Sequence, residues 1–295
     1  MSFQQLGLIG CGLMGGSFAL AAKRAGLVQK VVGFSPSFSS VQKALDMGVI
    51  DEAAKSAAQA VQGSDLVLLA LPVAATQATL ALIRPALDSS TLVMDVGSTK
   101  TDVVQAAQAG LQDRMGQFVP AHPIAGKEVS GVQFADAHLY AQQQVILTPV
   151  EATQAAFVQR AHNLWSALGC QVKLMSPQDH DAAFAAVSHL PHLLAFAFMN
   201  SLSAQAQGPD FLALAGPGFR DFTRIAASEP HMWRDILMAN AQEVLAQSQH
   251  FQQQLQALEL ALNQALSTGQ SEALMRLIEQ ASTQRAGWAM GSTAS

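Results

Sequence analysis

The glycine-rich segment Gly10–Gly15 (GCGLMG) constrains the fold of this 295-residue chain most strongly. It directly follows the apolar run Leu6–Gly10 and opens a helical pattern over Gly12–Ala25. In that context a G-x-G-x-x-G string predicts a turn that binds the pyrophosphate of a dinucleotide, because glycines allow the tight turn and the close approach of backbone to phosphate. Free N–H groups at the start of the helix then face the phosphates. The expected cofactor contacts are Gly10, Gly12, Leu13, Met14 and Gly15, together with Leu71 at the end of a later strand.

The second predicted strand, Lys30–Phe34, lacks the terminal acidic residue that usually binds the ribose 2′-hydroxyl of NAD. Ser35 follows this strand, and the nearest downstream acid is Asp46. A 2′-phosphate is therefore not repelled here, and the hydroxyls of Ser35 and Ser37 can donate hydrogen bonds to it. The sequence predicts NADP as the preferred cofactor, with NAD as the alternative, and Ser35 as part of the cofactor site.

Short apolar runs alternate with helical patterns over the first half of the chain. Besides the two strands above, these runs are Leu66–Leu71, Leu92–Val96, Phe118–Ala121, Val145–Thr148 and Gln171–Met175. Such strands, separated by helices, predict a mainly parallel sheet covered on both faces. We therefore expect an α/β fold, with a Rossmann-type doubly wound domain over residues 1–175 that a helix over Ala152–Leu168 and the last strand complete.

From about Ser176 onward the sequence shows no further strand pattern. Ala182–Ser203 is predicted to be a helix that bends near Pro191, since proline removes a helical hydrogen bond. Arg234–Ser267 is predicted to be one long helical stretch. We expect an all-helical domain for substrate binding and dimerisation over residues 176–285, followed by a disordered tail over 286–295.

The long helical stretch carries a heptad-like stripe of mostly apolar residues. Its members recur at alternating spacings of four and three: Val244, Ser248, Phe251, Leu255, Leu258 and Leu262. One interpretation is an amphipathic helix that packs on its own domain. The other, which we favour, is a subunit interface, because this repeat is typical of paired helices. The sequence thus predicts a homodimer formed through the helical domain.

Composition excludes several classes of partner. The formal net charge is −5 and like charges are not clustered, which argues against nucleic acid as a partner. The N-terminus has no basic region typical of a signal peptide, and the longest apolar stretches fall short of the roughly 20 residues that a membrane span needs. The two cysteines, Cys11 and Cys170, are not expected to form a disulfide. We therefore expect a cytoplasmic protein that acts on a small molecule.

Two polar clusters follow predicted strands, at the sheet edge where open α/β sheets bind ligands. Ser98 lies in the segment Asp95–Lys100 (DVGSTK), and His122 lies in the segment Ala121–Glu128 (AHPIAGKE). A histidine on a short loop at this edge is suited to proton transfer near neutral pH. The alternative for His122 is a loop histidine that only packs.

Two further clusters lie in the predicted helical part. His189 and His192 are three residues apart, which would suit a metal, but no third ligand has a suitable spacing. We expect no metal, and instead one histidine that donates to substrate and one that packs. Arg224 carries a planar guanidinium that suits carboxylates, and its apolar neighbours favour a buried or pocket position over a surface ion pair. Trp233 is either pocket wall or ordinary core.

Taken together and in order, these segments resemble the prephenate/arogenate dehydrogenase family of tyrosine biosynthesis. The matching segments are GLIGCGLMGGSFA, DVGSTK, AHPIAGKEVSG, SHLPH, GFRDFTRIA and MWRDI, and the resemblance extends from about Leu6 to about Leu277. It implies a nucleotide-binding domain, a helical domain that dimerises, and oxidative decarboxylation of a cyclohexadienyl substrate. Some members of this family carry further domains, which the chain is too short to include.

The resemblance assigns roles to matching positions. His122 would bind the substrate 4-hydroxyl and take its proton, and Ser98 would hold the same hydroxyl in line. Arg224 would pair with a substrate carboxylate, and His192 would bind the side-chain end. Glu128 would orient or gate one of the cations, and Trp233 would form pocket wall.

Two other functions compete with this one. A β-hydroxyacid dehydrogenase would share the two-domain plan, but such enzymes depend on a lysine in the helical domain, and residues 176–267 contain none. A dinucleotide-binding sensor would have kept the fold and lost the chemistry, against which Ser98, His122 and Arg224 all argue.

Overall fold

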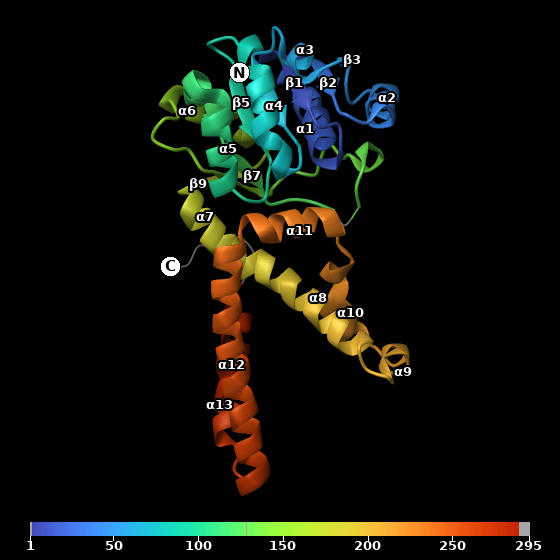
Figure 1. The fold of residues 1–295 in the computed structure, drawn as a ribbon, viewed down its shortest axis with the longest axis vertical. Coiled ribbons are helices and arrows are strands. Elements are labelled where there is room, and N and C mark those ends of the chain that lie inside the picture. The colour runs from blue at the N-terminus through green and yellow to red at the C-terminus, as the bar shows by residue number, and fades with distance from the viewer. Residues whose placement is uncertain (1, 128, 289–295) are drawn as a thin grey trace. The chain divides into compact units, whose positions relative to one another are not determined.

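The computed structural model of the chain describes residues 2–127 and 129–288 (Figure 1). Its main sheet has six parallel strands in the order β3-β2-β1-β4-β5-β6. The strands are β1 (Phe3–Ile9), β2 (Val28–Phe34), β3 (Glu52–Ala53), β4 (Leu66–Leu69), β5 (Leu92–Asp95) and β6 (Phe118–Val119). This order is that of the dinucleotide-binding doubly wound fold. The predicted fold class, a Rossmann-type sheet followed by a helical part, is confirmed.

Helices cover both faces of this sheet because alternate residues of its central strands point to opposite sides. Leu66 and Leu68 pack in the cluster that contains Phe18 and Trp165, whereas Val67 and Leu69 pack in the cluster that contains Leu80 and Val103. The first face is covered by α1 (Leu13–Arg24), α2 (Phe38–Asp46) and α6 (Ala155–Ala167), and the second by α3 (Ala57–Val61), α4 (Thr76–Ile83) and α5 (Thr101–Leu111).

A second, three-stranded sheet corrects the expected single sheet. β7 (Ala121–Pro123) pairs antiparallel with β8 (Gln144–Leu147), which pairs parallel with β9 (Gln171–Leu174). The predicted strand Phe118–Ala121 is thus split between two sheets at Pro120, which has no N–H to donate to a ladder. The carbonyl of Pro120 instead accepts the N–H of Thr148 at 3.0 Å. The split turns the chain toward the helical part directly before His122.

The helical part begins with one continuous run that contains a π-helical turn. The run comprises α7 (Pro177–Phe184), the π turn η5 (Ala185–His189) and α8 (Leu190–Ser203). The irregularity lies directly before Pro191, near the predicted bend. Shorter helices follow, namely α9 (Gly208–Ala213), α10 (Pro217–Thr223), the 3₁₀ turn η6 (Arg224–Ala227) and α11 (Pro230–Ala239). A π turn in a helix is often associated with a functional site.

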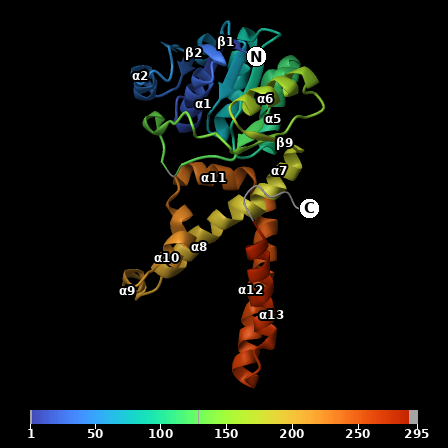
Figure 2. The same cartoon turned by 180° about the vertical axis from the view of Figure 1, so that it is seen from behind.

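Two predictions about the C-terminal helices are wrong. The stretch Arg234–Ser267 is not one helix, because α11 ends at Ala239 and α12 (Ala241–Thr268) begins after Asn240, whose side chain is drawn into buried hydrogen bonds. The helix α13 (Glu272–Gly287) includes two residues of the predicted disordered tail. Trp288 follows as the C-cap of α13, and residues 289–295 of that tail lie outside the described residues. The helices α12 and α13 run in opposite directions (Figures 1 and 2).

The chain forms two compact units, Met1–Ala241 and Gln242–Ser295. The first unit contains both sheets together with α7 to α11, and the predicted boundary at residue 175 lies inside it and stays a prediction. Among the described residues, the run Pro177–Ser203 is long and apolar enough to cross a membrane on length and composition alone. However, its first turns carry His180 and Asp181, which are buried and hydrogen-bonded to the sheet domain. Buried polar anchors of this kind are typical of a helix that packs within a folded domain.

Candidate active site

The glycine turn between β1 and α1 has the geometry of a phosphate cradle. Gly10 has a φ of +101°, and a Cβ there would lie 2.1 Å from the carbonyl oxygen of Ala70. A Cβ on Gly15 would lie 2.2 Å from the carbonyl oxygen of Gly10. A Cβ on Gly12 would meet nothing within 4 Å, so the space beside Gly12 is open. The fold itself therefore requires glycine at positions 10 and 15, whereas Gly12 leaves room for a ligand that approaches the backbone.

The N-terminus of α1 faces this space with Leu13 and Met14 in its first turn. Gly12 caps the helix without a side chain, and the first turn contains no acidic residue. Backbone N–H groups and the helix dipole therefore favour an anion at this place. The residues present fit the pyrophosphate of a dinucleotide.

Ser35 and Leu71 lie just beyond the carboxyl ends of β2 and β4, the sheet edge that carries the glycine turn. Leu71 is partly buried against the cluster beneath α4 and α5. Ser37 has a local task, since its hydroxyl accepts the N–H of Ser40 at 3.3 Å and caps α2. The hydroxyl of Ser37 is therefore engaged at the start of its own helix.

A buried ion pair fixes the backbone around Ser98 and His122. The ammonium of Lys100 lies 2.5 Å from the Asp95 carboxylate and donates to the carbonyl oxygen of Ala121 at 2.9 Å. The other oxygen of Asp95 accepts the N–H of Ala121 at 3.0 Å. Because an unpaired buried charge is costly, this pair holds the end of β5 against the start of β7.

His122 lies on β7 and contacts a histidine from the helical part. Its Nδ1 lies 2.8 Å from Nε2 of His180, on α7. The ring of Phe184 packs on both, with ring centroids 4.8 Å from His122 and 4.4 Å from His180. The side chain of His122 is half-buried. The first helix of the helical part thus completes the surroundings of the predicted base.

Asp181 joins α7 to the start of α5. Its Oδ1 lies 2.8 Å from His180 Nδ1 and accepts the backbone N–H of Lys100 at 2.8 Å. Its Oδ2 accepts the N–H of Thr101 at 2.8 Å. A carboxylate that accepts N–H groups at the beginning of a helix satisfies donors that have no partner within the helix. Asp181 is therefore rigidly held by a neighbouring element.

The electrostatic surroundings keep these histidines neutral. Burial, followed by the proximity of His180, Lys100 and His189, holds the pKa of His122 well below its ordinary value. Burial also lowers the pKa of His180, against the effect of Asp181. The hydrogen bonds from His180 and from the start of α5 outweigh burial and lower the pKa of Asp181. At neutral pH the cluster consists of two neutral imidazoles and one carboxylate, so His122 is able to accept a proton.

His189 and His192 occupy different surroundings. His189 is buried on η5, lies 3.1 Å from Asn240 Nδ2, and has a pKa lowered by burial to about 4. His192 lies one turn later, with Nδ1 donating to the carbonyl oxygen of Ser188 at 2.9 Å. Its ring stacks on Trp233, with centroids 3.4 Å apart. Trp233 is buried, so it supports His192 from behind, and His192 is the half-buried member of the pair.

The remaining predicted site residues are only partly brought together. Ser98 is half-buried in the loop after β5. Arg224 is exposed at the start of η6, so of the two predicted positions, buried or in a pocket, the buried one is wrong and the pocket one stays a prediction. The reason is that its apolar neighbours are themselves on the surface, as with Phe222 at 55% exposure. The neighbouring Thr223 lines a cavity of about 420 Å³ between α8 and η6. Glu128 lies outside the described residues.

Sequence reasoning missed four residues of this cluster: Lys100, His180, Asp181 and Asn240. Lys100 stands in the DVGSTK segment but shows no sign of being buried, and His180 and Asp181 resemble an ordinary polar helix start. The available signal was a histidine and a carboxylate side by side in the first turns of a helix whose remaining sequence is apolar. Among the described residues no group of three or more histidines, cysteines or acids could hold a metal ion, and the expectation of no metal stays a prediction.

Comparison with known proteins gives a consistent result. Residues 18–174 match the prephenate dehydrogenase nucleotide-binding domain, and residues 176–280 match the prephenate dehydrogenase dimerization domain. Cyclohexadienyl dehydrogenase from Zymomonas mobilis is 35% identical over 88% of this chain and 89% of its own length. Prephenate dehydrogenase from Bacillus subtilis is 38% identical over 81% of this chain, which spans only 64% of that relative's length.

A solved structure agrees with these matches. The crystal structure of prephenate dehydrogenase from Aquifex aeolicus in complex with hydroxyphenyl propionate and NAD⁺ is 35% identical and superimposes with a TM-score of 0.89, covering 97% of this chain and 98% of the other. Both domains are thus matched in order, along with the fold that brings His122 to the helical part. The chain belongs to the prephenate dehydrogenase family.

Proposed function

We propose that this chain catalyses the oxidative decarboxylation of prephenate, arogenate or both, with hydride transfer to NAD(P)⁺. The products are 4-hydroxyphenylpyruvate and tyrosine, respectively. The observation that carries the proposal is His122, a neutral imidazole on β7 that is hydrogen-bonded to His180 of the helical part, in a chain of this family. The bound dinucleotide supplies the hydride acceptor, and the residues of this chain supply binding, orientation and the proton acceptor.

The reaction needs one base at the 4-hydroxyl of the substrate. As the hydride leaves C4, the O–H bond breaks, its proton moves to His122, and the oxygen forms a carbonyl with C4. The bond from C1 to the ring carboxylate then breaks, and its electron pair makes the ring aromatic as carbon dioxide leaves. The phenolate oxygen takes the proton back from His122. Ser98, in the loop after β5, is proposed to hold the hydroxyl in line.

Residues of the helical part are proposed to bind the rest of the substrate. Arg224 is proposed to pair with a carboxylate, because a guanidinium offers two parallel N–H donors. His192, supported by the stacked ring of Trp233, is proposed to bind the side chain that distinguishes prephenate from arogenate. Its Nδ1 is engaged with Ser188, so Nε2 is the nitrogen left for a substrate. Glu128 is proposed to orient one of the cations.

NADP is proposed as the preferred cofactor over NAD. The support is the position after β2, where Ser35 stands in place of a carboxylate that would repel a 2′-phosphate. The related Aquifex aeolicus structure was solved with NAD⁺. The proposal therefore concerns the ratio of kcat/KM for NADP⁺ to kcat/KM for NAD⁺ in this chain.

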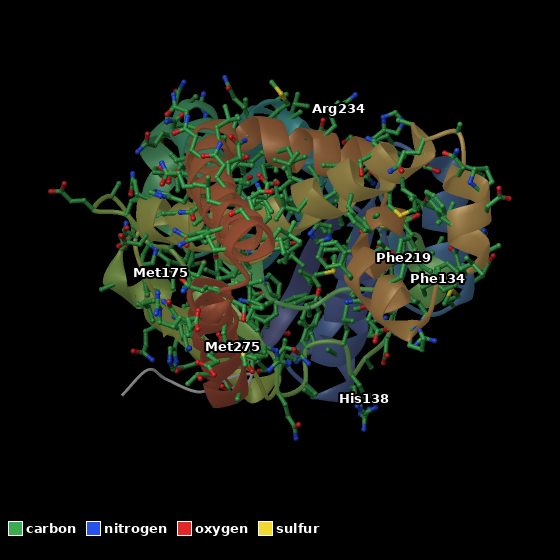
Figure 3. All side chains as sticks on the ribbon, turned by 90° about the horizontal axis from the view of Figure 1, so that it is seen from below. Phe134, His138, Met175, Phe219, Arg234 and Met275 are labelled. Atoms are coloured by element: carbon green, nitrogen blue, oxygen red, sulfur yellow. The ribbon has the colours of Figure 1, made fainter. Side chains whose placement is uncertain are left out.

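The chain is further proposed to work as a cytoplasmic homodimer through its helical part. Apolar side chains stand exposed there, among them Val187, Phe198 and Leu214. Phe198 is only partly covered by Phe219 and Phe222 of α10, with ring centroids 5.9 and 5.2 Å away. Figure 3 labels Phe219 in a view that draws the side chains. Large exposed apolar areas are typical of protein interfaces.

One assay tests the main proposal. Purified protein is mixed with prephenate or arogenate and with NAD⁺ or NADP⁺, and the reduced cofactor is followed by absorbance. Turnover with at least one substrate, and a higher kcat/KM with NADP⁺, is the expected result. Cofactor binding without turnover in all four combinations would refute the enzymatic function and favour a dinucleotide sensor.

A further inference from the structure

Three side chains form a linear hydrogen-bonded series that ends at the proposed base. His122 Nδ1 and His180 Nε2 are 2.8 Å apart, and His180 Nδ1 and Asp181 Oδ1 are also 2.8 Å apart. The two imidazoles come from different parts of the fold, β7 and α7. The chemistry described so far uses only His122 as the base, so it leaves His180 and Asp181 without a role.

The direction of every hydrogen bond in this series follows from its last member. An ionised carboxylate can only accept, so His180 must carry its proton on Nδ1. A neutral imidazole has one donor and one acceptor, so His180 Nε2 must accept. His122 must then donate from Nδ1, which leaves the lone pair on its Nε2. That nitrogen points away from the series and is the one able to take a proton.

If His122 instead accepted a hydrogen bond at Nδ1, His180 would have to donate from Nε2 as well as from Nδ1. His180 would then be protonated on both nitrogens. The charged and titratable groups facing this pair are Lys100 and Asp95 from β5 and its loop, Asp181 from α7, and His189 from η5. Burial and the ammonium of Lys100 oppose a second proton on His180, and they lower its pKa. Both imidazoles are therefore neutral, and only one pair of tautomers satisfies all the contacts.

The series is also mechanically fixed. Asp181 accepts the backbone N–H groups of Lys100 and Thr101, and Asn240 Nδ2 donates to the carbonyl oxygen of Asp181 at 2.8 Å. Phe184 packs on both imidazole rings. Neither Asp181 nor His180 can rotate without breaking a buried hydrogen bond, which is costly.

We propose that Asp181 and His180 are positioning residues that hold His122 in the tautomer with its proton on Nδ1 and its lone pair on Nε2. The inference rests on the proposed function, in which His122 is the base. When His122 accepts the substrate proton on Nε2, the imidazolium keeps its Nδ1–H bond to His180, and the nearby Asp181 carboxylate offsets its positive charge. His180 itself gains and loses no proton.

The first test reads the tautomer directly and needs no substrate. Nitrogen-15 NMR of histidine-labelled protein at pH 7.5 distinguishes a protonated ring nitrogen from an unprotonated one, and the signals lost in His122→Asn identify His122. The expected result is a protonated Nδ1 and an unprotonated Nε2 in the wild type. A wild-type His122 with its proton on Nε2 would overturn the proposal.

Two variants of His180 separate positioning from structure. In His180→Gln, the side-chain amide falls near the former Nε2 and can accept from His122 through its oxygen or donate to it through its nitrogen, because the link to Asp181 that fixes the direction is lost. In His180→Asn, the amide falls near the former Nδ1 and keeps the link to Asp181, but His122 has no acceptor. We expect His180→Gln to keep part of the wild-type tautomer, because its oxygen remains available as an acceptor, and His180→Asn to lose that tautomer.

Kinetics of the same pair complete the test. Because a general base contributes about 10²–10⁴-fold, His180→Asn is expected to lower kcat by about 10-fold or more with the cofactor KM unchanged, while His180→Gln is expected to lower kcat less. Equal losses in both variants with an unchanged tautomer would show a merely structural role and overturn the proposal. If both variants unfold, the wild-type tautomer decides. Absence of turnover in the wild type would refute the proposed function but leave the tautomer measurement valid.

Discussion

His122 is the residue on which the proposed chemistry depends most. In His122→Asn, the amide nitrogen takes the place of Nδ1 and can still donate to His180, but the basic Nε2 is gone. We expect kcat to fall by about 100-fold or more, with the dissociation constant of the cofactor unchanged, because only proton transfer is removed. Steady-state kinetics and fluorescence titration with NADPH measure the two quantities. A kcat equal to that of the wild type would exclude His122 as the base.

Gly12 and Gly15 allow the phosphate cradle to be tested apart from the chemistry. Gly12→Ala places a methyl group in open space, so the protein should stay folded, with a loss of about 1 kcal/mol or less for a poorer cap. A bound pyrophosphate would meet that methyl group, and cofactor affinity should fall at least 10-fold. Gly15→Ala is the matched comparison, since its Cβ would lie 2.2 Å from a carbonyl oxygen and should destabilise the fold itself. Thermal unfolding and cofactor titration check both, and unchanged affinity in Gly12→Ala would contradict the placement of the phosphates.

Ser35 is the residue proposed to determine the preference between NADP and NAD. Ser35→Asp introduces a carboxylate at the end of β2, where it repels a 2′-phosphate and accepts from a 2′-hydroxyl. The ratio of kcat/KM for NADP⁺ to that for NAD⁺ should fall at least 10-fold. Ser35→Asn is the control, because it has nearly the same shape without the charge and should change the ratio much less. An unaltered ratio in Ser35→Asp would mean that the ribose is recognised elsewhere.

At the scale of elements, the sequence predicts regular structure better than junctions. The strand and helix pattern up to residue 175 is visible because buried strands are short apolar runs and glycines mark the turns. The sheet switch at Pro120 is invisible, since a residue-by-residue pattern does not say which partner a strand will choose. The break at Asn240 is missed for a similar reason, because the helix stops to satisfy buried acceptors that lie 59 and 51 residues away in the sequence.

The residues of the candidate site also fall into two groups, those that the sequence predicts and those that it does not. Ser98 and the glycines lie just after strands, and His122 follows the predicted strand Phe118–Ala121, so predicted strand ends locate all of them. His180 and Asp181 act through contacts across 58 and 81 residues, and the ammonium of Lys100 contacts Ala121 across 21 residues. The sequence neighbours of these residues carry no sign of the contacts. For Arg224 the sequence predicted too much burial. Its apolar neighbours in sequence favoured a buried position, but the side chain is exposed. Composition around a residue predicts burial only when the element itself lies inside the fold.

The junction of β7, α7 and η5 should be sensitive to acid. The pKa values of His122, His180 and His189 are all lowered by burial, so below about pH 6.5 the unfolded chain binds protons that the folded chain does not. The contribution of these histidines to the free energy of unfolding is therefore complete above pH 6.5. It falls as the pH is lowered toward about 4, by up to about 1.4 kcal/mol per pH unit for each histidine that stays neutral. Urea unfolding at pH 7.5, 6.5 and 5.5 measures the decline. His189→Gln should flatten it, whereas His250→Gln, on the exposed face of α12, should not; a decline of equal slope in both would refute this origin.

At the scale of the whole molecule, the exposed apolar stripe on α12 is the feature that a single chain leaves unexplained. Phe251, Leu255, Leu258 and Leu262 stand 37–49% exposed, and Leu255 and Leu258 lie at its centre. A stripe with alternating spacings of four and three buries its side chains when a second helix packs against it. The matched dimerization domain, residues 176–280, includes this stripe, so a second copy is the partner that we expect.

Leu255→Glu should therefore convert a dimer into a monomer. A charge placed among apolar side chains of an interface costs several kcal/mol per copy, and the symmetric partner doubles the cost. Light scattering coupled to size-exclusion chromatography should give about twice the 31.0 kDa chain mass for the wild type and a single mass for the variant. Gln253→Glu adds the same charge two residues away, on the opposite side of the helix, and should leave the dimer intact. A wild type that elutes as a monomer, or a dimer that tolerates Leu255→Glu as well as Gln253→Glu, would show that the stripe is not the interface.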